Sequence, residues 1–147
     1  AYLDAVLEAV RFVADLAGQG RRPFDVLGHL DMVKRYTQRH RGGFDVAGCG
    51  DRIDEILKAC IDCGFTPEIN TSTLRQGLAE PMPAAWMVRR YAELGGQAMT
   101  LGSDAHSPEH IAADFDAATA LLRTNGIHQL AVFQDRVKSV FALPEDA

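Results

Sequence analysis

The sequence contains few cysteines and no long hydrophobic run, and both shortages exclude whole classes of protein. Cysteine occurs three times in 147 residues, at Cys49, Cys60 and Cys63, an odd number without paired spacing. This argues against a disulfide-stapled domain, and we expect reduced thiols. Cys60 and Cys63 form one C-x-x-C without a second pair at zinc-finger spacing, so we expect helix thiols there rather than a zinc or redox site. Every apolar run is far too short to cross a bilayer.

Positive charge is also scarce, since 15 Lys and Arg residues stand against 20 Asp and Glu residues, for a net charge of −5. This balance argues against a non-specific nucleic-acid binder. The densest basic stretch, residues 34–41, reads K-R-Y-T-Q-R-H-R, and charge alone allows either a solvated loop or an anion site. The first residues lack the pattern of a secretory signal. We therefore expect a cytoplasmic protein that binds neither membranes nor nucleic acid.

Helix and strand patterns alternate along the chain. Apolar residues at helical spacing cover 2–17, 52–63, 84–94 and 108–124, and short apolar runs predict strands over 24–28, 65–69, 97–101 and 128–133. Asp51 is the expected cap of the second helix, and residues 32–50 predict an irregular loop. This order is typical of α/β proteins built from parallel β/α units, in an open doubly wound sheet or in part of a β/α barrel. No glycine-rich phosphate loop is present, so we expect neither NAD nor ATP.

Polar residues follow three of these strands at the point where each ends. They are His29 with Asp31, Glu68 with Asn70, and Asp104 with His106. Polar clusters at successive strand ends favour a barrel, whose active site lies at the carboxyl ends of its strands. In an extended segment, residues two apart project to the same side, so Asp104 and His106 can converge on one metal ion. From this stretch alone, the alternative is a loop in which Ser103 or Asp104 caps a helix that begins at Pro108.

Three motifs in order, G-H-L-D at 28–31, E-I-N-T-S at 68–72 and G-S-D-A-H at 102–106, resemble the later motifs of the PHP family. More narrowly, the chain resembles the C-terminal half of PHP-type histidinol-phosphatases over nearly its whole length. The resemblance implies about the last four strands of a distorted seven-stranded, TIM-like β/α barrel. Residues 1–147 would then be a single domain or a C-terminal fragment of that barrel. The family's opening H-x-H motif would precede Ala1, and we expect the chain to be part of something longer.

The resemblance also implies two or three divalent metal ions, either zinc, manganese or iron, in the mouth of the complete barrel. His29, Asp104 and His106 match metal ligands of the family, and Asp104 and His106 are the expected catalytic residues. A water molecule held by such metals can lose its proton near neutral pH and attack a phosphate monoester. Arg35 and Arg75 follow strand ends and are expected to contact the phosphate group.

The remaining polar residues are expected to have other roles. Glu68 points from a strand and is expected either to be a barrel-interior group or to hydrogen-bond a metal ligand rather than bind the metal itself. Asp31 either supports a ligand or caps a loop. His40, His110 and His128 match no motif and are left outside the expected site.

The function implied by the resemblance is hydrolysis of a small-molecule phosphomonoester, histidinol phosphate, to histidinol and phosphate in histidine biosynthesis. This chain would carry only the C-terminal part of the site. It would need the missing N-terminal half of the barrel as its partner and would be inactive alone. Two alternatives stay open, namely a non-catalytic half-barrel that requires a partner segment, and a PHP phosphoesterase that acts on another phosphoester such as a nucleotide.

Overall fold

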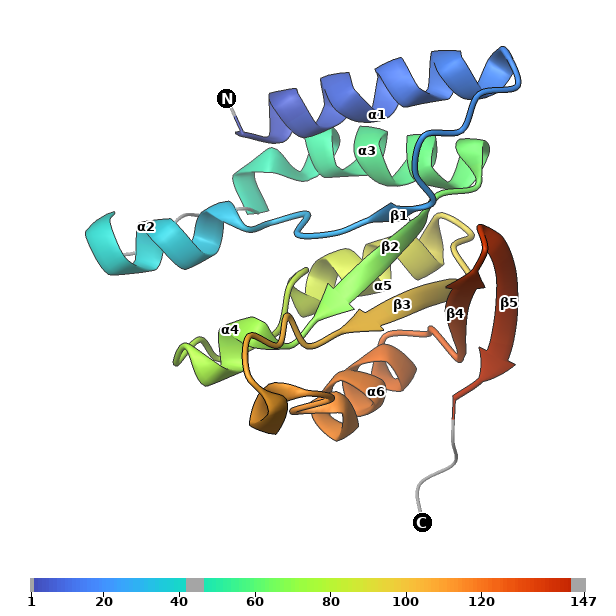
Figure 1. Ribbon diagram of the computed structural model, residues 1–147. Helices are drawn as coiled ribbons and strands as arrows, with labels where there is room; N and C mark the ends of the chain where they lie inside the picture. The colour runs from blue at the N-terminus through green and yellow to red at the C-terminus, as the bar shows by residue number, and fades with distance from the viewer. Residues whose placement is uncertain (1, 42–46, 144–147) are drawn as a thin grey trace.

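Helices and strands alternate around one five-stranded sheet (Figure 1). The computed structural model describes residues 2–41 and 47–143, without the side chains of residues 38–41 and 47. The helices are α1 (Tyr2–Gly18), α2 (Val33–Arg41), η1 (Ala47–Cys49), α3 (Gly50–Cys63), α4 (Ser72–Arg75), α5 (Ala85–Glu93), η2 (Pro108–His110) and α6 (Phe115–Thr124). The strands are β1 (Val26–Leu27), β2 (Thr66–Asn70), β3 (Ala98–Gly102), β4 (Gln129–Gln134) and β5 (Val137–Ala142). None of the described helices is long and apolar enough to cross a membrane.

The sheet has the order β1-β2-β3-β4-β5, and β1 to β4 run parallel. In the register of β2 with β3, Glu68 lies beside Thr100 and Asn70 lies beside Gly102. The predicted α/β fold with parallel strands is therefore confirmed. Each of these four strands begins and ends within two residues of its predicted range. The apolar runs that predict β2 and β3 supply Phe65, Ile69 and Met99 to the core under the helices.

The two faces of β2 and β3 differ in chemistry. Ile69 and Met99 are 0% and 1% exposed and belong to the core formed with the helices. Because side chains alternate along a strand, Glu68 and Asn70 lie on the opposite face of β2, next to Thr100 on β3. Figure 1 shows α5 behind β2 and β3, with this opposite face toward the viewer. The sheet thus has an apolar face under the helices and a polar face on the other side.

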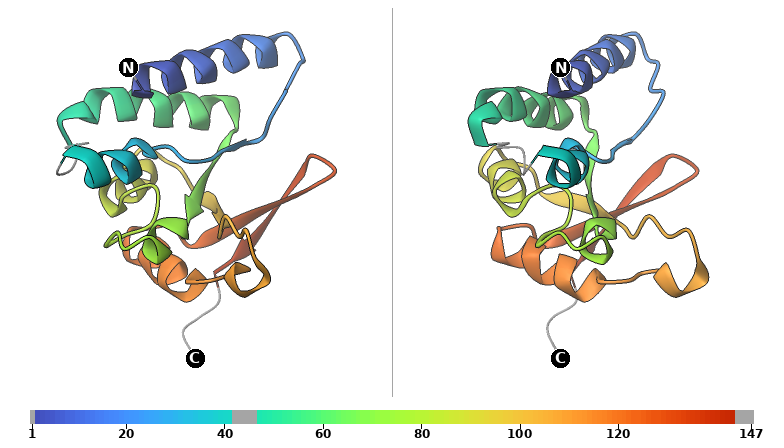
Figure 2. Two further views of the ribbon diagram at one scale, coloured as in Figure 1. Left: turned by 60° about the vertical axis from the view of Figure 1, so that its left-hand side comes forward. Right: turned by 90° about the vertical axis from the view of Figure 1, so that its left-hand side faces the viewer.

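The antiparallel strand β5 is absent from the predicted elements. Asp135 and Arg136 join it to β4, and their φ angles are 48° and 67°. Positive φ at both central residues is what a type I′ hairpin turn requires, but Asp-Arg lacks the glycine that marks most such turns. Both views in Figure 2 show this hairpin projecting from the body of the molecule, and every residue of β5 is exposed.

Two other predicted segments are wrong in part. Residues 32–50, expected as an irregular loop, contain α2 and η1. The sequence of α2, V-K-R-Y-T-Q-R-H-R, has too few apolar residues to show a helical stripe. The helix expected over 108–124 is divided into η2 and α6, because Ala112 and Asp114 between them take positive φ angles of 58° and 61°. Asp51 lies inside α3, whose cap is Cys49.

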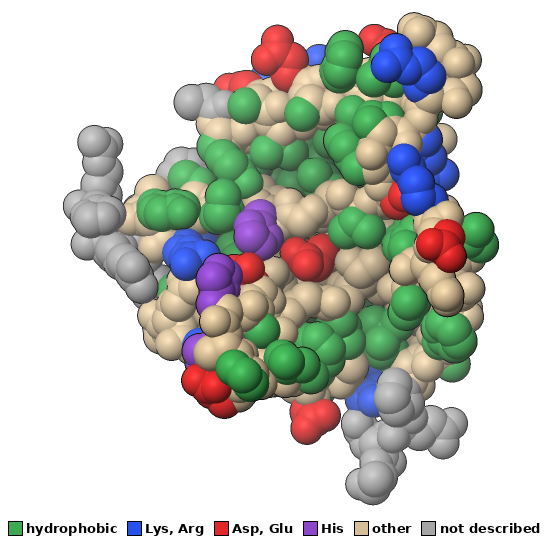
Figure 3. Space-filling view, viewed as in Figure 1, with side chains coloured by type: hydrophobic (Ala, Val, Ile, Leu, Met, Phe, Trp, Pro, Cys, Tyr) green, Lys and Arg blue, Asp and Glu red, His purple; other side chains and the backbone are tan. Residues whose placement is uncertain are grey.

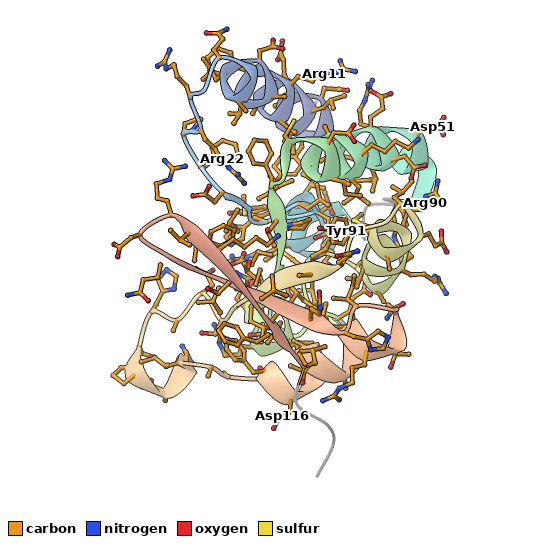
Figure 4. All side chains as sticks on the ribbon, turned by 90° about the vertical axis from the view of Figure 1, so that its right-hand side faces the viewer. Arg11, Arg22, Asp51, Arg90, Tyr91 and Asp116 are labelled. Carbon is orange, nitrogen blue, oxygen red and sulfur yellow. The ribbon has the colours of Figure 1, made fainter. Side chains whose placement is uncertain are left out.

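An ion pair joins α3 to α5 on the outer surface. Arg90, labelled in Figure 4, donates from Nε and Nη2 to the two carboxylate oxygens of Asp54 at 2.7 and 2.6 Å. These hydrogen bonds hold the pKa of Asp54 below its usual value. Because the pair is partly exposed, it contributes little to stability, and the apolar layer beneath it supplies most of the helix packing.

The described cysteines are free, as predicted. Cys60 is fully buried within α3, and burial raises the pKa of its thiol to about 12. A thiol in this state is a packing group, since the reactive form of cysteine is the thiolate.

Candidate functional site

The turn after β1 places His29 in a left-handed backbone conformation. Its φ is 55°, which is uncommon for any residue other than glycine. The carbonyl of His29 accepts hydrogen bonds from the Tyr2 hydroxyl at 2.6 Å and from the Met32 N–H at 3.1 Å. Because Tyr2 belongs to α1, a contact between distant parts of the chain holds the turn that carries the imidazole.

Asp31, two residues after His29, has a structural role. It is fully buried, and its Oδ2 accepts from the Ala84 N–H at 3.0 Å and lies 2.9 Å from Lys34 Nζ. Lys34 also donates to the Pro81 carbonyl at 2.6 Å. Burial raises the pKa of Asp31, and the positive charge of Lys34 counteracts that shift. The pair ties the turn after β1 to the segment before α5, so Lys34 does not belong to a solvated loop.

The polar face of β2 carries a hydrogen-bonded group that reaches His29. Asn70 Nδ2 lies 3.2 Å from His29 Nε2 and donates to Glu68 Oε2 at 3.2 Å. Glu68 Oε2 in turn lies 4.0 Å from His29 Nε2. Figure 3 shows histidine and acidic side chains close together near the middle of this face. An imidazole, an amide and a carboxylate therefore meet at the ends of β1 and β2.

Two glycines make room for the Glu68 carboxylate. A Cβ atom added at Gly102 would lie 2.1 Å from Glu68 Oε1, and one added at Gly28 would lie 3.1 Å from Glu68 Oε2. Gly28 follows β1 and Gly102 ends β3, so the carboxylate of the central strand fits between its two neighbours. Both glycines belong to the sequence motifs. A side chain at either position would crowd the Glu68 carboxylate, which is a steric reason for glycine there.

Replacing Gly102 by alanine is expected to displace this carboxylate. The Glu68 side chain is flexible at its end, so we expect it to rotate away while the free energy of unfolding falls by only about 1 kcal/mol. A crystal structure and thermal unfolding of Gly102→Ala measure both effects. Gly18→Ala is the control, because nothing lies within 4 Å of a Cβ there. A carboxylate that stays in place while β3 shifts would contradict this expectation.

The turn after β3 carries the other predicted ligands. Asp104 has a φ of 48°, so the segment is not extended as predicted. The two side chains nevertheless lie near each other, with His106 Nδ1 4.0 Å from Asp104 Oδ1. His106 Nδ1 also lies 2.8 Å from the Asp104 carbonyl, which can only accept, so Nδ1 carries the proton. This leaves the Nε2 lone pair of an imidazole that is 82% exposed available to a metal ion.

Both predicted arginines reach the same turn. Arg35 Nη1 lies 4.0 Å from Asp104 Oδ2. Arg75, at the end of α4, donates from Nη2 to the Ser103 carbonyl at 2.6 Å and to the Asp104 carbonyl at 3.4 Å. The Nη1 atom of Arg75 is buried without a hydrogen-bond partner. Segments that follow β1 and β2 therefore converge on the turn that follows β3.

The donor types suit a divalent metal, but the described residues do not complete a site for one. Imidazole and carboxylate groups fit zinc, manganese or iron. Among residues 2–37 and 48–143, no group of three or more His, Cys, Asp or Glu residues is close enough to hold a metal ion. The Nδ1 atom of His110 pairs with the Ser107 hydroxyl, at 3.0 Å. The side chain of His40 falls outside the described residues.

Comparison with known proteins relates the chain to one group of enzymes. No protein-family model matches. A probable histidinol-phosphatase of Thermotoga maritima is 33% identical over 126 residues, which cover 86% of this chain and 49% of the relative. One from Clostridium acetobutylicum is 38% identical over 96 residues, covering 64% of this chain and 36% of the relative. The chain is a relative of the histidinol-phosphatases. It spans about half or less of the length of these histidinol-phosphatases.

The crystal structure of a histidinol phosphate phosphatase from Lactococcus lactis has a similar fold. It superposes with a TM-score of 0.63 and 23% identity, over 95% of this chain and 52% of that protein. That crystal contains zinc, L-histidinol and phosphate. The predicted resemblance to histidinol-phosphatases is confirmed by the two relatives, and this structure shows a similar fold.

Three contributors to the site are absent from the predicted metal and phosphate ligands. Tyr2 lies in a helix far from the motifs, whereas Asn70 and Gly102 belong to the motifs at 68–72 and 102–106 without a predicted role. Their roles depend on contacts across 27 or more residues or between neighbouring strands. Only the assembled sheet brings these groups together.

Proposed function

We propose that this chain forms part of the active site of a metal-dependent phosphatase that hydrolyses histidinol phosphate to histidinol and phosphate. The observation that carries the proposal is the convergence of three motif turns at one end of the parallel sheet. Arg35 and His106 both lie 4.0 Å from the Asp104 carboxylate, and Arg75 binds the same turn. The names of the relatives and the zinc, histidinol and phosphate in the similar crystal structure support this substrate.

His29, Asp104 and His106 would hold the metal in the complete site. A divalent metal supplies positive charge for the phosphoryl oxygens and activates water for attack on phosphorus. His106 is ready to bind because its proton is held on Nδ1 by the Asp104 carbonyl. Arg35 and Arg75 would contact the phosphate group, and the buried, unpartnered Nη1 of Arg75 provides a donor beside the Asp104 turn.

We further propose that residues 1–147 are the C-terminal part of a distorted seven-stranded β/α barrel, and that the N-terminal half supplies the remaining metal ligands. β1 and β5 are the outer strands of the described sheet. Val137, Val140 and Phe141 of β5 are 66%, 45% and 57% exposed, which is unusual for a finished sheet of this size. On this view the chain alone is inactive. We also propose that the protein lies in the cytoplasm, the compartment of histidine biosynthesis.

The test is phosphate release by the protein that contains this chain, with histidinol phosphate and with nucleoside monophosphates as competing substrates. We expect hydrolysis of histidinol phosphate, its loss after treatment with a chelator, and recovery when zinc or manganese is added back. Faster hydrolysis of the nucleotides would favour the alternative phosphoesterase. Activity that survives complete removal of metal would contradict the proposal.

A further inference from the structure

We propose that Thr71 is a positioning residue that holds both ends of the loop formed by residues 103–113, which carries the two proposed metal ligands after β3. Thr71 directly follows β2 and is 0% exposed. Its N–H donates to the Gly102 carbonyl at 2.9 Å, and its hydroxyl donates to the Ala113 carbonyl at 2.7 Å. One buried residue therefore contacts the backbone at the start of the loop and again at its end.

The loop needs such a hold because little of it is packed against the rest of the molecule. None of residues 103–113, all of which the structure describes, is buried. The His106 side chain is 82% exposed, and Ile111 is 71% exposed. The N–H groups of His110, Ile111 and Ala113 donate to carbonyls only three residues back. Such bonds shape the loop locally, whereas its place beside the sheet depends on contacts with other segments.

The backbone around Ala113 gives a second reason. Ala112 and Asp114, on either side of it, take left-handed φ angles of 58° and 61°. Residues other than glycine adopt this conformation at a cost, and it persists where the surrounding structure holds it. The Thr71 hydroxyl binds the carbonyl that lies between these two residues, which is where the strained backbone needs support.

The start of the loop has a further contact, since Arg75 Nη2 donates to the Ser103 carbonyl at 2.6 Å. Loss of the Thr71 hydroxyl would therefore free mainly the far end of the loop, beyond Asp104 and His106. A loop that is held before a metal ion arrives loses less conformational freedom when the ion binds. This consequence rests on the proposed function, because it takes Asp104 and His106 as ligands, whereas the opening of the loop can be measured by itself.

The experiment is amide hydrogen exchange, followed by NMR, in the metal-free protein that contains this chain. Thr71→Val keeps the shape of the side chain and removes the hydroxyl. We expect the N–H groups of Ala112 and Ala113 to exchange about 5-fold faster in this variant, the effect of losing one hydrogen bond. Thr71→Ser keeps a hydroxyl and should restore the native rates. In the native protein the Thr71 hydroxyl proton should itself exchange slowly, because the residue is fully buried. A native hydroxyl proton that exchanges rapidly with water would overturn the inference even if Thr71→Val failed to fold.

The matched control is Thr73→Val. Thr73 lies on α4, is also 0% exposed, and donates from its hydroxyl to the Glu80 carbonyl at 2.8 Å. This variant loses the same kind of hydrogen bond, but to a different segment. Thermal unfolding should show a similar loss of stability in both valine variants, while Ala112 and Ala113 keep their native exchange rates in Thr73→Val. Equal acceleration of the loop in the two variants would show a general loss of stability and would overturn the inference.

Zinc added to the native protein and to Thr71→Val separates this inference from the proposed function. If Asp104 and His106 bind zinc, the ion holds the same loop, so it should slow the exchange of Ala112 and Ala113 in both proteins. Exchange that ignores zinc, in a variant whose loop opens faster than the native one, would refute the two residues as ligands and leave the role of Thr71 intact. Native exchange rates in metal-free Thr71→Val would overturn the role of Thr71 whatever zinc does.

Discussion

Replacing Asp104 by asparagine in the protein that contains this chain should lower kcat/KM for histidinol phosphate at least about 100-fold, since changing even a residue that only supports a ligand often costs that much. The variant removes the negative charge of the turn after β3 while keeping its shape. Asparagine also tolerates the left-handed backbone that Asp104 adopts at a φ of 48°. Metal content per chain, measured on the same preparation, should fall in parallel.

Asp135→Asn is the matched control for this experiment. Asp135 has the same φ of 48°, is exposed, and lies in the hairpin turn between β4 and β5. Activity and metal content should both be unchanged in this variant, because the chemical change is identical but lies in the projecting hairpin and not in a motif turn. Asp104→Asn with native metal content and native activity would refute the assignment of Asp104 as a ligand.

The sequence predicts the parallel part of the sheet because that part follows from local pattern. The strands over 65–69 and 97–101 are short apolar runs between helices, and burial under α3 and α5 requires such runs. The β5 strand is not predicted from the sequence. All of its residues are exposed, so its side chains do not alternate between buried and exposed positions. Its only sheet partner among the described strands is β4, and that pairing depends on a turn without glycine.

The sequence likewise predicts one part of the site and not another. It predicts which motif residues lie together, because parallel strands bring their carboxyl ends to one edge of the sheet. It does not predict the left-handed turns at His29 and Asp104, because neither residue is glycine and each turn is held by a distant side chain, Tyr2 or Arg75. The convergence of Asp104 and His106 was expected from an extended segment, and it arises instead from a turn in which His106 donates to the Asp104 backbone.

Replacing Phe65 by alanine should have the largest effect on stability, lowering the free energy of unfolding by about 3–5 kcal/mol. Phe65 is 1% exposed and immediately precedes β2, where its ring packs against that of Phe24 with 5.2 Å between centroids. The guanidinium of Arg22 lies over the same ring at 5.7 Å. Loss of the ring leaves a cavity that this closely packed neighbourhood cannot fill. Chemical denaturation measures the change.

The control is Phe12→Ala on α1, where the ring is 64% exposed and the free energy of unfolding should change by only about 0.5 kcal/mol. Phe65 lies before the first residue of β2, whereas Glu68 and Asn70 lie toward its carboxyl end. Phe65→Ala should therefore reduce stability without changing the zinc affinity of the folded protein, the reverse of Asp104→Asn. A Phe65→Ala variant that keeps native stability would show that the apolar layer around the start of β2 is not what holds the site's central strand in place.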